Sequence, residues 1–98
     1  MATVSLAARA LADLERIFEF IAIRDPARAL AVVESVRDGI DVLARHPLVG
    51  RRVEDGLREL VVGRGTATYV AKYRWYPQSE QALVLAICHA REAGYLDE

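Results

Sequence analysis

The sequence predicts an α+β fold: a short N-terminal strand and an antiparallel helical hairpin, packed on one face of a three- to four-stranded, mainly antiparallel sheet. Two observations predict this class. Apolar residues recur at helical spacing as far as His46-Pro47, and beyond that point they alternate or form short runs between turn residues. A chain of 98 residues can bury one core, so we expect a single domain over residues 1–98.

The N-terminal part predicts a short strand followed by a helix. Residues 2–4 can form an edge strand, and Ser5 suits the N-cap of the next helix because its hydroxyl can accept from an orphan amide. The helix is expected to run to about Arg24. Its apolar stripe is formed by Ala7, Leu11, Leu14, Phe18 and Ile21.

A second helix is predicted to begin at Asp25-Pro26, where aspartate can cap and proline is tolerated in the first turn. Gly39 inside this helix lowers its stability by about 1 kcal/mol relative to alanine, which predicts close packing against the first helix. His46-Pro47 ends the helix, and the short connection predicts a helical hairpin. The second apolar stripe is formed by Leu30, Val33, Val36, Ile40 and Leu43.

Three strands are predicted in the second half, after a loop over residues 47–56. The first covers residues 57–62, and the second covers residues 68–76 with strict alternation of side chains. A turn follows at residues 77–80. Residues 82–88 are apolar on both faces, which indicates a central strand of the sheet.

Composition bounds the protein class. An apolar fraction of 53% with 28% charged residues describes a globular protein. No apolar run reaches the roughly 18 residues that span a membrane, and the N-terminus lacks the pattern of a signal peptide. The lone Cys88 cannot form an internal disulfide, so we expect a cytoplasmic protein.

Neither a metal nor a cofactor is expected. The only soft ligands are His46, Cys88 and His89, and none has the spacing of a zinc site. The two glycines around Arg64 match neither a dinucleotide-binding loop nor a P-loop. Cys88 and His89 are neighbours on a predicted strand, so their side chains point to opposite faces and do not form a catalytic dyad.

The charge distribution leaves two interpretations of the sheet open. The whole chain has a net charge of −1, but five cations and two acids give residues 57–91 a net charge of +3. An exposed sheet face with Lys72 and Arg74 could bind an anionic partner, either RNA or an acidic protein segment. The alternative is an ordinary solvated sheet face, which the charge distribution by itself favours over a binding surface.

The stretch ICHAREAGY ends the last predicted strand with chemically active side chains. His89 and Arg91 share a face if the strand runs to His89, and Tyr95 follows after a turn. These groups could perform acid-base chemistry on a phosphodiester. Alternatively, His89 is a hydrogen bonder at the strand end, Arg91 pairs with a carboxylate, and Tyr95 closes the edge of the core.

The order and spacing of these segments resemble the RelE/ParE superfamily of toxins from bacterial type II toxin-antitoxin pairs. The resemblance rests on LRELVVGR at Leu57–Arg64, the alternating aromatic strand after it, the apolar strand ending in HAREAGY, and ARHPLVGRRV at the end of the helical hairpin. It covers nearly the whole chain. It implies the fold predicted above and, as partner, a ParD- or RelB-like antitoxin in a hetero-oligomer.

The superfamily contains two activities on one fold. RelE-like members are ribosome-dependent mRNA endoribonucleases that use cations on the sheet and near the C-terminus, whereas ParE-like members act on DNA gyrase. Where the nucleases place their sheet cations, this sequence has Glu59, Val61 and Val70, and only the C-terminal part of the site, from His89 to Tyr95, remains. The resemblance therefore favours a ParE-like gyrase inhibitor that acts by binding and is not an enzyme.

Two alternatives stay open. In a RelE-like endoribonuclease acting on ribosome and mRNA, His89 would be general acid or base, Arg91 a phosphate clamp and Tyr95 an orienting group. An inactive member would only bind the antitoxin. The residues expected to face the target are Arg64, Lys72, Arg74, His89 and Arg91. Those expected to contact the antitoxin are Leu14, Phe18, Ile21, Val33 and Trp75.

Overall fold

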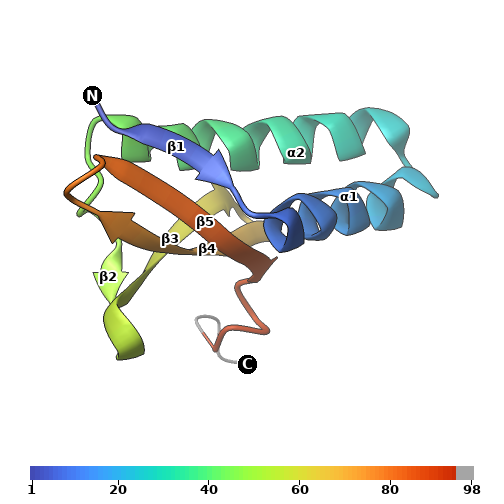
Figure 1. The fold of residues 1–98 in the computed structure, drawn as a ribbon. Helices are drawn as coiled ribbons and strands as arrows, with labels where there is room; N and C mark the ends of the chain where they lie inside the picture. Colours follow the sequence, from blue (N-terminus) through green and yellow to red (C-terminus); the bar gives the residue numbers. More distant parts are fainter. Residues whose placement is uncertain (95–98) are drawn as a thin grey trace.

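The structure, a computed structural model, describes residues 1–94. Both helices lie on one side of a single sheet, and the chain after the last strand turns to the other side (Figure 1). This architecture confirms the predicted fold class. In chain order the elements are β1 (Thr3–Leu6), α1 (Ala8–Ala22), α2 (Pro26–Asp41), η1 (Val42–Ala44), β2 (Arg51–Arg52), η2 (Glu54–Gly56), β3 (Leu57–Arg64), β4 (Ala67–Tyr76) and β5 (Gln81–His89).

The sheet has the strand order β1-β5-β4-β3-β2. β1 runs parallel to β5, and all other neighbours are antiparallel. β5 is the last strand in the sequence but lies inside the sheet, as its two apolar faces predict. The described sheet has one strand more than expected, because Arg51 and Arg52 in the predicted loop pair with Glu59 and Arg58 of β3.

The boundary between β1 and α1 differs from the prediction. Ser5 is not an N-cap but lies within β1, where it pairs with Leu83 of β5. The ladder extends to Leu6, and the Ala7 N–H then donates to the Val84 carbonyl at 2.8 Å. Helix α1 can therefore begin only at Ala8, and Ala7 precedes it without a side-chain cap.

The start of α2 follows the prediction. The Asp25 carboxylate accepts a hydrogen bond from the Arg28 N–H at 3.1 Å, and Pro26 occupies the first turn. The two helices face the sheet with only part of the apolar stripes identified in the sequence. Leu14, Val36 and Ile40 are buried there, whereas Leu11 and Leu30 are 46% and 57% exposed. The resulting core consists of Ala10, Leu14, Val32, Val36, Ile40, Leu43, Val62, Tyr69, Ala71, Tyr73, Ala82, Val84 and Ile87.

One carboxylate lies beside this apolar core. Asp13 of α1 is only 3% exposed. One of its oxygens accepts from the Ile87 N–H of β5 at 2.8 Å, and the other accepts from the Arg16 guanidinium at 2.8 Å. A buried carboxylate is stable only when its acceptors are satisfied. The bond from Ile87 fixes α1 against the C-terminal half of β5, and Arg16 of the same helix satisfies the other oxygen.

The geometry of the sheet explains why the Ile87 amide needs this partner. β1 pairs with β5 only as far as Val84, so the outer edge of β5 has no neighbouring strand beyond that residue. The ladder with β4 also shifts here, and Leu85 is left without an opposite residue. Asp13 thus takes the place of a strand at an edge that would otherwise leave a buried amide unpaired.

Gly39 is required for close packing, but against a different element from the predicted one. An added Cβ at Gly39 would lie 2.8 Å from both Cβ and Cγ1 of Val62 in β3. The close approach is therefore between α2 and the sheet, and not between the two helices. Val62 is branched at Cβ and 3% exposed, so it has little room to move away.

Replacing Asp13 by alanine should lower the free energy of unfolding by about 1–3 kcal/mol, because the Ile87 amide loses its acceptor while remaining buried. Asp13→Asn, which keeps one acceptor oxygen, should lose less. Urea denaturation followed by circular dichroism measures both variants. Asp38→Ala, at an exposed aspartate of α2, serves as the control and should change stability little. Equal stability of Asp13→Ala and wild type would refute the role of this carboxylate.

The direction in which Gly39→Ala changes the free energy of unfolding tests the packing of α2 against Val62. Helix propensity alone predicts that alanine stabilises the protein by about 1 kcal/mol. Overpacking against Val62 predicts the opposite, a loss of about 1–3 kcal/mol. The same urea titration decides between them, and a variant more stable than wild type would contradict the packing described here.

Candidate functional site

The sheet separates the residues predicted to face a target. Opposite residues on neighbouring strands share a face, so Val62, Tyr69 and His89 form one cross-strand row. Gly39 of α2 packs on Val62, which places this row on the helical side. The adjacent positions, including Lys72, therefore face away from the helices. His89 and Lys72 do not meet in one site.

His89 ends β5 with both ring nitrogens engaged. Nε2 lies 2.9 Å from the Thr66 carbonyl in the β3–β4 turn, and Nδ1 lies 3.0 Å from the backbone N–H of Arg91. A carbonyl can only accept and an amide N–H can only donate. These partners therefore specify the neutral ring with its proton on Nε2.

The ring also packs edge-on against Tyr69, with 5.3 Å between ring centroids. Its own backbone N–H donates to the Glu92 carboxylate at 3.1 Å. His89 thus holds the β3–β4 turn and the chain after β5 in place. Both ring nitrogens already have backbone partners, whereas a general base needs a lone pair available to its substrate.

The remaining C-terminal candidates are Arg91, Tyr95 and Cys88. Arg91 is exposed in the turn after β5. Tyr95 lies outside the described residues. Burial raises the pKa of the Cys88 thiol, and the negative charge of Glu92 raises it further. The thiolate is therefore disfavoured, which argues against a nucleophilic cysteine.

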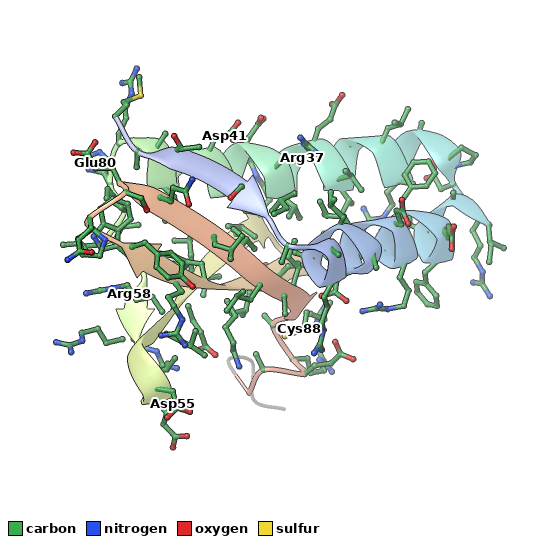
Figure 2. All side chains as sticks on the ribbon, viewed as in Figure 1. Arg37, Asp41, Asp55, Arg58, Glu80 and Cys88 are labelled. Carbon is green, nitrogen blue, oxygen red and sulfur yellow. The ribbon has the colours of Figure 1, made fainter. Side chains whose placement is uncertain are left out.

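The face away from the helices is apolar at its centre. Val61, Val70 and Cys88 are direct cross-strand partners there, and Val70 is only 1% exposed. Figure 2 shows Cys88 close to the end of β5. This row gives the middle of the face no group that could bind a phosphate.

The next row on this face contains an ion cluster. Glu59 lies opposite Lys72, and its two carboxylate oxygens lie 3.3 Å from Arg51 Nη2 and 3.7 Å from Lys72 Nζ. The Glu59 side chain is 11% exposed. The predicted basic face is thus partly neutralised by its own acid. Arg74 lies further along this face and pairs with Leu57.

Arg64 lies beside the turn that His89 contacts through the Thr66 carbonyl. It ends β3 opposite Ala67, at the turn formed by Gly65 and Thr66. The five residues therefore form two groups. Arg64, His89 and Arg91 lie around the β3–β4 turn and the end of β5, whereas Lys72 and Arg74 lie on the face away from the helices.

Apolar grooves follow the helical hairpin. One groove of about 410 Å³ runs along the two helices and is lined by Leu11, Leu14, Glu15, Phe18, Glu19, Val33 and Arg37. Three of the residues predicted to contact an antitoxin thus line a single groove. Leu14 is only 5% exposed and forms part of its floor.

A second groove, of about 710 Å³, lies between the hairpin tip and the end of β5, and Ile21, Tyr69 and His89 are among its lining residues. Phe20 and Ile23 at its rim are 79% and 83% exposed. Burial raises the pKa of the Tyr69 phenol, and the nearby Arg28 partly opposes this rise. Trp75 lines neither groove and packs against the core near the other end of β4.

Within residues 1–94, no group of three or more His, Cys, Asp or Glu side chains is arranged to hold a metal ion. In the same part of the chain, no helix combines the length and hydropathy needed to cross a membrane.

Comparison with known proteins gives consistent matches. Residues 4–94 match the profile of a family described as the ParE toxin of the type II toxin-antitoxin system, parDE. Toxin RelE3 of Caulobacter vibrioides is 33% identical over 92 residues, which cover 94% of this chain and 98% of the relative. Toxin RelE1 of the same organism is 32% identical over 72 residues, or 74% of this chain and 77% of the relative.

Two solved structures have similar folds. A chain from the chromosomal ParDE TA system of P. aeruginosa has a TM-score of 0.76 at 24% identity, covering 91% of this chain and 96% of that one. A chain from the toxin-antitoxin complex RelBE2 of Mycobacterium tuberculosis has a TM-score of 0.58 at 28% identity, covering 90% and 96%.

The Cys88 thiol should react slowly with Ellman's reagent. Because its pKa is raised in the folded state, the midpoint of the pH–rate curve should lie above about 8.5, the ordinary thiol value. The urea-unfolded chain should give the ordinary midpoint. By linkage, the contribution of Cys88 to stability is present below the ordinary pKa and is lost as pH rises through the folded pKa. A folded-state midpoint below about 8.5 would contradict the burial described here.

Proposed function

Because this chain belongs to the RelE/ParE superfamily of type II toxins, and matches the ParE toxin family within it, we propose that it binds and inhibits DNA gyrase. Inhibition would arrest growth until a ParD-like antitoxin neutralises the toxin. The activity is one of binding, without a chemical step on this chain. The fold alone does not distinguish it from a nuclease, so the proposal depends on particular side chains.

The observation on which the proposal rests is the apolar row formed by Val61, Val70 and Cys88. RNA cleavage builds negative charge on a phosphate, and losing one preorganised group that stabilises such charge lowers a rate by about a hundredfold to a thousandfold. Val61 and Val70 stand at two of the positions where nucleases of the superfamily place cations. Glu59 stands at a third and pairs with Lys72.

The state of His89 supports the same conclusion. Its Nε2 proton is directed to Thr66, and its Nδ1 lone pair is directed to the Arg91 amide. Accepting a proton on Nδ1 would break the second bond. This ring is therefore suited to hold the end of β5 and poorly suited to exchange protons with a substrate.

The grooves along the hairpin suit an antitoxin. An amphipathic helix or strand of the partner could bury Leu11, Phe18 and Val33 in one groove, and Phe20 and Ile23 in the other. Toxin and antitoxin would then form a hetero-oligomer. A partner that binds only the native state also stabilises the toxin.

The relatives favour a second candidate. Both curated relatives are named RelE toxins, and one structural neighbour is a RelBE2 complex. A RelE-like ribosome-dependent endoribonuclease would use His89 as acid or base, Arg91 as phosphate clamp and Tyr95 as orienting group. It would need Lys72, Arg74 or Arg64 to replace the absent sheet cations.

Purified toxin should inhibit supercoiling of relaxed plasmid by gyrase, and should trap cleaved DNA, at concentrations on the order of 1 μM. Agarose gels resolve both products. Induction in cells should arrest growth and induce the DNA-damage response. A toxin that leaves supercoiling unchanged and traps no cleaved DNA would disprove gyrase inhibition.

The nuclease is tested in parallel by toeprinting on translating ribosomes. Cuts in the A site that disappear in His89→Ala and Arg91→Ala would establish the second candidate. The gyrase proposal instead expects no cuts from the wild-type toxin. Unimpaired growth on induction would indicate a chain that only binds antitoxin.

A further inference from the structure

One motif of the sequence has no role in the function proposed above. Residues 45–52, RHPLVGRR, follow the helical hairpin and end with the short strand β2, and we call them the clamp loop. Leu48 and Val49 at its centre are 56% and 53% exposed. Arg45, Arg51 and Arg52 around them are also exposed, whereas Gly50 is buried.

The clamp loop is fixed to the sheet by a buried tyrosine. The Tyr73 hydroxyl donates to the Pro47 carbonyl at 2.7 Å and accepts from the Gly50 N–H at 2.9 Å. Tyr73 itself is 0% exposed. Burial raises the pKa of its phenol, so the hydroxyl keeps its proton and remains a donor. Both ends of the Leu48-Val49 pair are thereby held.

A second anchor comes from the neighbouring strand. Arg58 of β3 is the cross-strand partner of Tyr73. Its guanidinium donates to the carbonyls of Leu48 at 3.0 Å and Gly50 at 2.9 Å. Figure 2 shows Arg58 near β2, at the edge of the sheet. Two adjacent side chains of the sheet thus make four hydrogen bonds to the backbone of the clamp loop.

The backbone at Gly50 lies directly on the tyrosine. A Cβ added there would lie 2.6 Å from Cε1 of Tyr73, 2.7 Å from its hydroxyl oxygen and 3.0 Å from the Glu59 carbonyl. Only glycine permits this approach. The position of the clamp loop is therefore specified as tightly as that of a core element.

A loop held this firmly would be expected to bury its apolar side chains, yet Leu48 and Val49 point outward. Exposed apolar groups on a rigid loop lose little conformational freedom on binding, which is how preorganised surfaces gain affinity.

The clamp loop follows the end of α2, and the α1–α2 connection lies at the opposite end of the helices (Figure 1). It is thus far from the groove at the hairpin tip.

The charges of the clamp loop indicate the chemistry of its partner. Residues 45–52 contain three arginines and no acid, although the whole chain has a net charge of −1. One of the three, Arg51, also contacts Glu59. An apolar centre with a cationic rim matches the layout of protein–protein interfaces. Leucine and valine offer nothing to a phosphate backbone or a base stack, so nucleic acid fits this surface less well.

We propose that the clamp loop is the surface through which the toxin contacts its target, and that it fits an acidic protein surface with an apolar centre. The inference rests on the toxin function proposed above but does not depend on gyrase being the target. It replaces the dispersed set of sheet cations as the predicted target-facing surface.

The main test is the double variant Leu48→Ser/Val49→Ser. Growth arrest on induction in cells should be lost, and the toxin concentration for half-inhibition of gyrase should rise roughly tenfold or more. The melting temperature should remain close to that of wild type because both side chains are exposed. Leu30→Ser, which alters a 57% exposed leucine on α2, is the matched control and should keep full toxicity.

The charge-reversal variant Arg45→Glu/Arg52→Glu tests the rim and covers the case in which the serine variant does not fold. Induction of this variant should no longer arrest growth. Inhibition of gyrase by the wild-type toxin should weaken as salt is added. Full toxicity of either folded variant would overturn the proposal. If wild type arrests growth without inhibiting gyrase, the gyrase proposal fails, and the growth assay still decides the role of the clamp loop. If the wild-type chain does not arrest growth, both the gyrase proposal and the clamp-loop proposal fail.

Discussion

The hydrogen bond from the Ile87 amide to the Asp13 carboxylate joins the two layers of this protein. It links residues 74 positions apart in the chain. β1 stops pairing at Val84 and a bulge follows at Leu85, so the edge of β5 needs a polar partner at the point where α1 crosses it. The end of β5, which holds His89, is positioned from this bond onward. Arg16 donates a hydrogen bond to the second oxygen of the carboxylate, and this paired charge offsets the cost of burying Asp13 beside the core.

Periodicity was sufficient to predict the two helices and the three long strands, because stripes and alternation report which side of each segment is buried. It was not sufficient for contacts between distant segments. Nothing near Gly39 in the sequence indicates that its neighbour is Val62, and nothing near Asp13 indicates Ile87. Ser5 has the chemistry of a cap, but pairing with β5 outweighs it. The pair Arg51–Arg52 is too short for any pattern to predict a strand.

In the candidate site, too, the character of single residues could be predicted from the sequence, whereas their contacts could not. The apolar character of Val61 and Val70 is visible in the sequence, and the structure adds that these residues pair directly and continue to Cys88. The separation of His89 from Lys72 depends on which face each occupies, and the ladder register sets this. The anchoring of the clamp loop by Tyr73 and Arg58 could not be predicted, because its hydrogen bonds end on backbone atoms. Any sequence supplies backbone carbonyls and amides at every position.

The position of β5 inside the sheet has a consequence for how the protein is made. Its partners are β4 and β1, and β1 pairs Thr3 with Gln81. A ribosome synthesises β1, both helices and β3 long before the strand that joins them. The nascent chain therefore lacks this inner strand of its sheet until β5 emerges, and long-range pairing of this kind slows folding. The five-stranded sheet can therefore be completed only after β5 has been synthesised.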